Sequence, residues 1–326
     1  MPVYNLQKYI NKAIESVVNQ TFSDYELIII DDGSTDQTLN VCMKYSEKYE
    51  NIKIITQKNS GVSTARNNGI NKSIGKYLIF LDGDDWWKDH NMLEKIHYDL
   101  ESRAGKAELY TFSYERYYED STEKIVKYNN FNNITIKEKI VNTGEFIQHV
   151  LYGKEVFCWF SWLYVYKAEI IRGKRYFDNK IAIFEDTVFL YSLLKDNIKI
   201  FCTSNVFYSY RCKRAGAATD LNVGKMEQLL GVSNKLITDA LWNSDYNEDE
   251  KRIITNNLAH SFYLCLIYLY AKGIDKERLR EVLKCNIGMT KYTTAGKDVV
   301  IKKMLNIAGI SATGLLLHIR SLLKKI

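Results

Sequence analysis

Residues 77–87, with the sequence YLIFLDGDDWW, constrain the fold of this chain more than any other stretch. The five apolar residues at its start predict a strand buried on both faces. Three carboxylates within the next four positions would repel one another unless a cation lay among them, and oxygen ligands suit Mg²⁺ or Mn²⁺. Open α/β sheets bind ligands at the carboxyl ends of their strands, so this stretch predicts a metal and phosphate site. An acidic surface turn before a helix is the alternative.

Two earlier segments also predict strands of the same sheet. Residues 27–30 and 52–55 are apolar and predict strands, and the first of them runs directly into carboxylates that include Asp32. Strands that alternate with helical patterns at this spacing predict βαβ units and a mainly parallel sheet. Right-handed crossovers gather the strand ends along one edge, so we expect Tyr4, Asp32 and Asp84 to lie near one another.

The composition is typical of an ordinary globular protein, with 46% apolar and 26% charged residues among 326. This length allows one large domain or two ordinary ones. The six cysteines form no CxxC pair, which argues against a zinc site or a disulfide framework and for a cytosolic setting. No signal peptide is expected before the first helix. The most apolar run, residues 262–271, is too short to span a bilayer and predicts a buried helix.

Two segments each allow a structural and a functional interpretation. Residues 157–162, FCWFSW, are dense in aromatic side chains. They predict core packing or, alternatively, a platform on which Trp162 stacks against a sugar ring. Residues 181–189 place Glu185 and Asp186 among apolar neighbours at the start of a helix. A carboxylate there either caps the helix or, being partly desolvated, acts as a general base.

Two loops are also ambiguous. Residues 117–133 are rich in Tyr, Asn, Lys and Glu and predict a hairpin or a mobile loop. Residues 211–216, RCKRAG, follow a predicted strand and form a basic segment. That segment is suited to closing over phosphates, and the alternative is an exposed loop with solvated charges.

The C-terminal part differs in charge from the rest. Residues 224–326 lack strand patterns and predict helices. From Lys251 onward there are 14 Lys/Arg and 4 Asp/Glu, a net charge of +10, so the +6 of the whole chain leaves −4 for the first 250 residues. Residues 299–326 fit an interfacial amphipathic helix attracted to anionic lipids, or a packed helix with its basic face outward. No nucleic-acid partner is expected, because no basic and aromatic interleaving or reader motif occurs.

Six motifs occur in order along the first 186 residues: PVYN at 2–5, QTF at 20–22, DDGSTD at 31–36, SGVSTARNNGI at 60–70, FLDGDD at 80–85 and ED at 185–186. This set resembles the family 2 glycosyltransferases, inverting enzymes of the GT-A fold. The resemblance implies an α/β, Rossmann-like, mainly parallel sheet flanked by helices over residues 1–215, with a helical extension over 216–326. Family members normally have a full apolar strand before the PVYN-like motif. This sequence starts at Met1, so we expect a truncated first strand, through either a miscalled start or a real truncation.

The resemblance implies roles on the donor side of the site. Pro2 and Tyr4 would lie at the nucleotide, with the Tyr4 ring against the uracil of a UDP-sugar. Asp32 would accept a hydrogen bond from the base. Arg66 would lie near the diphosphate, and Asp82 would face the ribose.

It also implies roles at the metal and on the acceptor side. Asp84 would ligate a divalent ion, Mn²⁺ or Mg²⁺. Asp186 would be the catalytic base that takes the proton of the attacking hydroxyl. Glu185 and Trp162 would shape the acceptor side, and residues 211–216 would fold over the donor.

These roles together predict an enzyme that moves a sugar from a UDP-sugar to a hydroxyl of a glycan or lipid-linked acceptor in surface polysaccharide synthesis. Its expected place is the cytoplasm, peripheral on the inner face of the cell membrane. A truncated, non-catalytic nucleotide-sugar-binding protein is the alternative. A nucleotidyltransferase is disfavoured, because residues 4–7, YNLQ, are not a Gly-rich basic loop.

Overall fold

The computed structural model describes residues 1–102, 105–118, 126–128, 136–151, 159–212, 222–294 and 297–323. The chain divides into two compact units. The first unit comprises Met1–Val150, Glu155–Ile181 and Glu185–Ala217. The second unit comprises Leu151–Lys154, Ala182–Phe184 and Ala218–Ile326.

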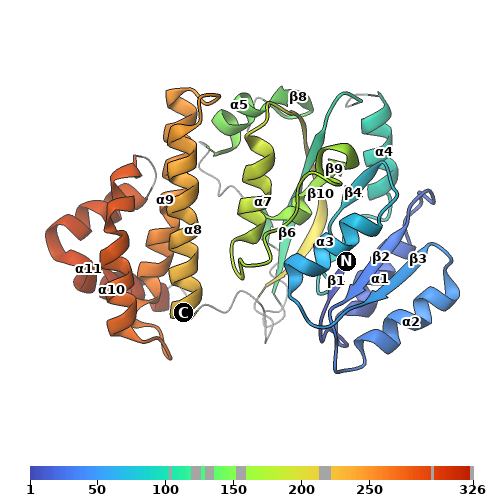
Figure 1. The fold of residues 1–326 in the computed structure, drawn as a ribbon, viewed down its shortest axis with the longest axis horizontal. Helices are drawn as coiled ribbons and strands as arrows, with labels where there is room; N and C mark the ends of the chain where they lie inside the picture. The colour runs from blue at the N-terminus through green and yellow to red at the C-terminus, as the bar shows by residue number, and fades with distance from the viewer. Residues whose placement is uncertain are drawn as a thin grey trace. The chain divides into compact units, whose positions relative to one another are not determined.

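The first unit begins with a parallel sheet whose strand order is β1-β2-β3. Its strands are β1 (Pro2–Val3), β2 (Leu27–Asp31) and β3 (Ile52–Thr56). The helices between and after them are α1 (Ile10–Val18), α2 (Thr38–Lys48) and α3 (Val62–Lys72). Helix α3 packs against β1 and β2, and α2 packs against β2 and β3 (Figure 1). The predicted strands at 27–30 and 52–55 are confirmed, and β2 is buried along its whole length, with α2 and α3 both in contact with it.

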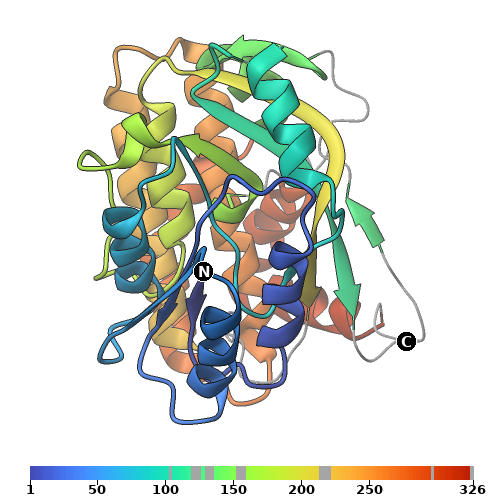
Figure 2. The ribbon, with the colours of Figure 1, turned by 90° about the vertical axis from the view of Figure 1, so that its right-hand side faces the viewer.

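A second, mixed sheet has the strand order β4-β9-β6-β10-β5 among the described residues, with β7 added to β6 and β8 to β10. Its strands are β4 (Tyr77–Ile79), β5 (Trp86–Trp87), β6 (Leu109–Tyr118), β7 (Val126–Tyr128), β8 (Lys139–Asn142), β9 (Tyr164–Lys167) and β10 (Lys199–Cys212). Strands β6 and β10 run parallel to each other, and the long, curved β10 is visible beside β6 in Figure 2.

The strand predicted at the acidic stretch is present, but its predicted burial is wrong. Strand β4 covers Tyr77–Ile79, and these three residues are only half-buried. The strand lies at the edge of the mixed sheet, where it pairs antiparallel with β9. Of the five apolar residues at 77–81, only Phe80 and Leu81, just after the strand, are buried. An apolar run does not distinguish a central strand from an edge strand whose side chains are covered on one face.

The predicted hairpin at 117–133 is confirmed where the structure describes it. Strand β7 pairs antiparallel with β6, with Tyr128 opposite Tyr114 and Val126 opposite Arg116. Residues 119–125 and 129–135 lie outside the described residues. The remaining helical elements among the described residues 92–194 are α4 (Met92–Ser102), α5 (Thr143–Phe146), the π-helical turn Ile147–Leu151, the 3₁₀ turn Ser161–Leu163, α6 (Ala168–Ile171) and α7 (Glu185–Leu194).

The second unit is helical, as predicted. Its main helices are α8 (Val223–Trp242), α9 (Glu248–Ile267), α10 (Lys276–Asn286) and α11 (Asp298–Leu323). The 3₁₀ turns Tyr268–Tyr270 and Ile287–Tyr292 connect them (Figure 1). Asn247 and Glu250 form a capping box that fixes the start of α9, because each side chain bonds the other residue's N–H. The buried helix predicted at 262–271 is confirmed as far as Ile267, where α9 ends and the 3₁₀ turn Tyr268–Tyr270 follows, with Phe262, Leu266 and Leu269 in the core.

Candidate active site

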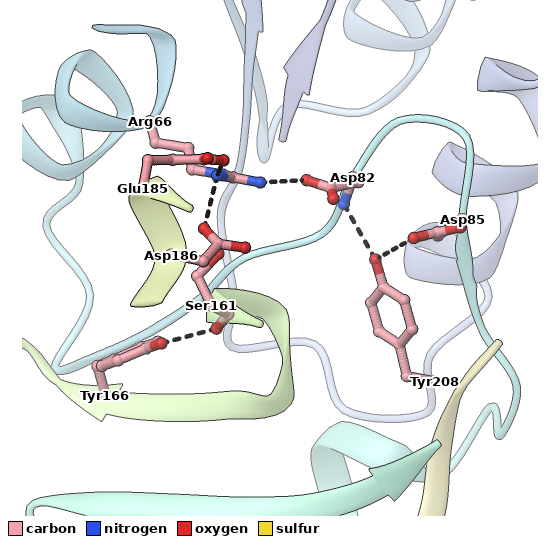
Figure 3. A network of polar contacts seen from close by, with 8 residues as sticks. All are labelled: Arg66, Asp82, Asp85, Ser161, Tyr166, Glu185, Asp186 and Tyr208. Atoms are coloured by element: carbon pink, nitrogen blue, oxygen red, sulfur yellow. Dashed lines mark hydrogen bonds and ion pairs between the residues drawn. The ribbon is translucent and has the colours of Figure 1, made fainter. Parts of the chain in front are cut away.

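A single guanidinium binds three carboxylates in the first unit. Arg66 Nη1 lies 2.8 Å from Asp186 Oδ1 and 3.0 Å from Glu185 Oε1. Its Nη2 lies 2.9 Å from Asp82 Oδ1. The four side chains come from three places in the chain: α3, the segment after β4 and the first turn of α7 (Figure 3). The structure therefore brings together residues from three of the motifs.

Burial makes this arrangement electrostatically demanding. The Arg66 side chain is only 4% exposed, and its ring neighbour is Phe177, at 5.2 Å from the guanidinium carbon. Burial disfavours the charged guanidinium, but attraction by Asp186, Asp82 and Glu185 outweighs it and raises the pKa of Arg66. Three carboxylates around one cation leave a net charge of about −2 when all are ionised, so one of them favours its protonated form.

Burial and neighbouring charges change the proton affinity of Asp186. Burial raises the pKa of Asp186 to about 7; Arg66 opposes the rise, and Glu185 and Asp82 add to it. The backbone N–H of Ser161 donates to Asp186, and the Ser161 carbonyl oxygen accepts a 2.7 Å bond from Tyr166 Oη. Asp186 is thus held by groups outside its own helix, and an aspartate with a pKa near neutrality is suited to general-base chemistry.

The backbone that leads into this pair is unusual. Phe184, the residue before α7, has φ 74°, a left-handed backbone conformation that residues other than Gly rarely adopt. Such strain is kept only where surrounding interactions enforce it, and it is common at functional sites. The turn starts α7 at Glu185, so that both carboxylates of the pair fall in its first turn.

The acidic stretch after β4 is tied to strand β10. Asp85 is buried, and its carboxylate accepts bonds from Tyr208 Oη (2.8 Å) and the Arg211 N–H (2.7 Å). Tyr208 Oη also accepts a bond from the Asp82 N–H at 3.2 Å (Figure 3). Arg211 Nε donates to the Asp84 carbonyl oxygen at 2.8 Å. Two residues of β10 therefore fix the backbone of residues 82–85.

These contacts separate the roles of the neighbouring aspartates. Burial raises the pKa of Asp85 well above its usual value, and repulsion from Asp84 and Asp82 adds to the effect. Asp85 already binds two donors inside the protein, whereas Asp84 is half-buried. The roles of Asp85 and Tyr208 could not be predicted from the sequence. A tyrosine in a strand gives no local sign that its hydroxyl meets a carboxylate 123 positions earlier.

The donor set of this stretch fits a divalent ion shared with a substrate. Within the described parts of the chain, no three His, Cys, Asp or Glu side chains gather into a complete protein metal site. Mg²⁺ typically binds one or two carboxylates together with substrate phosphates and water, so a complete protein cage is not required. Asp84, beside Asp82, supplies hard oxygen donors of that kind.

The stretch also lies against the first strand. Gly83 leaves no room for a side chain, because a Cβ there would come within 2.8 Å of Val3 Cγ1 and of Leu6 Cδ1. The Pro2 carbonyl oxygen would be 3.3 Å away. Residues 82–85 and the start of the chain therefore meet, as the gathering of strand ends predicted. Tyr4 is the next residue after Val3 in the chain, and it is 45% exposed.

Asp32 has a structural role in this arrangement. Its carboxylate accepts bonds from Gln57 Nε2 (2.7 Å) and from the N–H groups of Ser60 and Gly61 (2.8 Å each). These contacts hold the loop that leads into α3, and therefore help to place Arg66. The expected bond from Asp32 to a nucleotide base stays a prediction.

Trp162 lies in the core beneath the site. It is 1% exposed and stacks on Tyr208 with ring centroids 4.1 Å apart. The rings of Phe160 and Tyr210 also stack with the Trp162 ring, with centroid distances of 4.8 and 5.4 Å. Of the two interpretations of the aromatic segment, the burial favours core packing over a sugar platform at Trp162. Residues 157 and 158 lie outside the described residues.

The basic segment at 211–216 is described only at its start. Arg211 is buried at the end of β10, with its guanidinium carbon 4.7 Å from the Tyr9 ring and 5.1 Å from the Trp86 ring. Residues 213–216 lie outside the described residues. Closure of this segment over a donor stays a prediction.

Comparison with known proteins shows which family the chain belongs to. The sequence profile of the family described as Glycosyl transferase family 2 matches residues 1–165, about half of the chain. The cholesterol galactosyltransferase of Borreliella burgdorferi is 30% identical over 224 residues, which cover 68% of this chain and 61% of that protein. The chain spans 34%, 59% and 61% of the lengths of three curated relatives that it matches.

Two solved structures share the fold. The crystal structure of S. aureus TarS 1-349 in complex with UDP-GlcNAc has a TM-score of 0.73 at 17% identity, covering 97% of this chain and 88% of that one. The mannosyltransferase PcManGT from Pyrobaculum calidifontis, in complex with GDP-Man and Mn²⁺, has a TM-score of 0.56 at 13% identity, covering 100% and 86%. These likenesses confirm the predicted α/β architecture, a mainly parallel sheet flanked by helices with a C-terminal helical part.

Proposed function

Because this chain belongs to glycosyl transferase family 2, we propose that it moves a sugar from a nucleotide-sugar, of the UDP type, to a hydroxyl of a glycan or lipid-linked acceptor, with inversion at the anomeric carbon. The observation that carries the proposal is the Asp186 carboxyl group, held by Arg66 and with its pKa raised to about 7. The transfer belongs to surface polysaccharide synthesis in this proposal.

Asp186 acts as the general base. An acceptor hydroxyl is a weak nucleophile, and a carboxylate within hydrogen-bond reach takes its proton as the new bond to the sugar forms. A pKa near the working pH gives the base the largest driving force that still leaves it deprotonated. Glu185, on the same turn, adds negative charge that keeps the proton affinity of Asp186 high.

Arg66 orients the base in this scheme. Its planar guanidinium contacts three carboxylates at once, which a lysine ammonium on a flexible stem would not reproduce. The family resemblance implies that Arg66 lies near the donor diphosphate, and that placement stays a prediction. Its contacts support a role in fixing Asp186 relative to Asp82.

Asp84, with Asp82 beside it, would hold the divalent ion. The ion would offset the negative charge that develops on the departing diphosphate. Asp85, Tyr208 and Arg211 keep the backbone of this stretch in place, so its carboxylates do not have to reorganise when a substrate arrives. The base and the ion ligand stand on separate elements, which leaves Asp186 free of metal.

The similar proteins support the substrate classes. TarS was solved with UDP-GlcNAc, and PcManGT with GDP-Man and Mn²⁺. The Borreliella relative is named for galactose transfer to cholesterol. A nucleotide-sugar donor, a divalent ion and a hydroxyl acceptor are therefore the partners that we propose for this chain.

Release of UDP from a panel of UDP-sugars tests the proposal. Purified protein with Mn²⁺ and a hydroxyl acceptor should release UDP, and chelation of the metal should stop the release. Asp186→Asn should slow transfer by about 10²–10⁴-fold while UDP affinity stays within about twofold, because the substitution removes the proton acceptor and keeps the shape of the side chain. Asp84→Ala should weaken metal-dependent UDP binding instead.

Asp249→Asn is the matched control, since Asp249 is an exposed carboxylate in the second unit. This control should leave both the rate of UDP release and the metal-dependent UDP affinity unchanged. UDP binding without release for any donor would favour a non-catalytic nucleotide-sugar-binding protein. Near-normal turnover of Asp186→Asn would show that the base is another group.

A further inference from the structure

Helix α11 carries an exposed aliphatic stripe along its second half. The stripe consists of residues after Gly309 at spacings of three and four, which fall on one helical face: Ala312, Leu315, Leu316 and Ile319. We call these four residues the outer stripe. Leu316 is 52% exposed. A row of exposed aliphatic side chains of this length is a candidate interaction surface.

The opposite face of the same helix is packed into the second unit. Thr313, Gly314 and Leu317 are buried. A Cβ at Gly314 would lie 2.9 Å from Leu269 Cδ2, so this glycine permits close contact between α11 and the turn after α9. The helix is therefore anchored on one side, and the outer stripe faces away from that anchor.

Charge indicates what the outer stripe binds. Residues 299–326 contain five Lys/Arg and no Asp/Glu. Lys303 and Arg320 are exposed on the described part of the helix, the first before the outer stripe in the sequence and the second directly after Ile319. Aliphatic side chains flanked by cations alone match a surface with an apolar interior and negatively charged headgroups.

The backbone decides between crossing a membrane and lying on it. Residues Asp298–Ser321 are long and apolar enough to span a bilayer by length and hydropathy. However, Gly309 has φ 73° and ψ 177°, which breaks the helix into residues 298–308 and 310–323. At 1.5 Å per residue these parts are about 16 and 21 Å long, shorter than the ~30 Å hydrocarbon core. Together with the packed face at Gly314, the break favours a helix in the plane of the interface.

We propose that the outer stripe of α11 binds the anionic surface of a lipid bilayer, with Lys303 and Arg320 at the headgroups. The second unit thereby makes the chain a peripheral membrane protein, on the cytoplasmic face that the sequence analysis expected. The inference rests on the second unit alone and does not depend on the transfer reaction.

Vesicle sedimentation of the full chain tests this surface. The protein should sediment with phosphatidylcholine vesicles that contain phosphatidylglycerol, and far less with phosphatidylcholine alone. Leu315→Gln with Leu316→Gln should reduce partitioning about tenfold or more, because it removes apolar area from the stripe. Lys303→Glu with Arg320→Glu should reduce it by a similar factor on anionic vesicles, since each cation near the surface contributes to attraction.

Ile74→Gln is the control, because Ile74 is exposed in the first unit and lies outside the stripe. It should partition like the wild type. Leu316→Trp provides a second readout: its added emission should be quenched by brominated lipid. Equal partitioning of the stripe variant and the wild type would overturn the proposal. Equal binding to neutral and anionic vesicles would also overturn it. A third contrary result would be a protein that does not bind vesicles but self-associates, with the self-association lost in the stripe variant.

Discussion

Nη1 of Arg66 lies 2.8 Å from Oδ1 of Asp186, although the two residues are 120 positions apart in the sequence. The same nitrogen bonds Glu185, and the other amino group bonds Asp82. The proton affinity of Asp186 is therefore set by burial, one guanidinium and two carboxylates. Each of these contributions can be changed by a single substitution.

The pH dependence of turnover should follow the ionisation of Asp186. The group accepts a proton only when it is deprotonated, so kcat/KM should rise with pH through about 7, the pKa that burial gives this residue. UDP release measured from acidic to basic buffers checks the midpoint. Asp186→Asn should be slower by about 10²–10⁴-fold and should lack this rise. A wild-type midpoint near the ordinary aspartate value of about 4 would contradict the assignment.

Removal of Arg66 should affect both stability and the base. Arg66→Ala leaves three carboxylates without their shared cation, and loss of one partner of a buried ion pair costs about 3–5 kcal/mol. Because Arg66 lowers the pKa of Asp186, the variant should also shift the pH–rate midpoint upward and lose activity at neutral pH. Urea unfolding and the pH profile measure the two effects.

A surface ion pair gives the comparison for that variant. Arg278 Nη2 lies 3.1 Å from Glu227 Oε2, with both side chains more than half exposed. Arg278→Ala should cost less than about 1 kcal/mol and leave the pH profile unchanged, because exposed pairs are screened by water. Equal losses of stability in the two variants would mean that the Arg66 cluster contributes no more than a surface pair.

The sequence was sufficient to predict the local parts of this fold. Strands β2 and β3 and the helical second unit follow from apolar runs and helical spacing. Residues of the Arg66 cluster were each identified as site candidates, but their shared contact was not. Arg66 is 16 positions from Asp82 and 119 from Glu185, and no local pattern encodes such pairing. The edge position of β4 was missed for the same reason, since its partner β9 comes much later in the chain.

Tyr208 should matter more for metal-dependent binding than its distance in sequence suggests. Tyr208→Phe removes the hydroxyl that donates to Asp85 and accepts from the Asp82 N–H. A buried polar group that loses its hydrogen-bond partner lowers the free energy of unfolding by about 1–3 kcal/mol. The stretch that carries Asp84 should loosen as well, so UDP affinity in the presence of Mn²⁺ should fall. Calorimetric titration with UDP measures this loss, and thermal unfolding measures stability.

Tyr110 is a matched control for that experiment. Its hydroxyl donates to Asp99 at 2.8 Å, and both residues are buried. Tyr110→Phe should lose stability of the same order with UDP affinity unchanged. If both tyrosine variants weakened UDP binding equally, the effect of Tyr208 would come from general destabilisation rather than from its contacts with residues 82–85.

Gly83→Ala tests whether close contact with the start of the chain positions the acidic stretch. The added methyl group would lie 2.8 Å from both Val3 and Leu6 side-chain carbons, a distance at which something must move. Overpacking of this kind typically costs about 1–3 kcal/mol. Displacement of the stretch should also lower Mn²⁺-dependent UDP affinity, because Asp84 follows directly. Gly231→Ala in α8 is the control: it meets nothing within 4 Å and should stabilise the helix by about 0.5–1 kcal/mol. Wild-type UDP affinity in Gly83→Ala would show that Val3 and Leu6 can move aside without displacing Asp84.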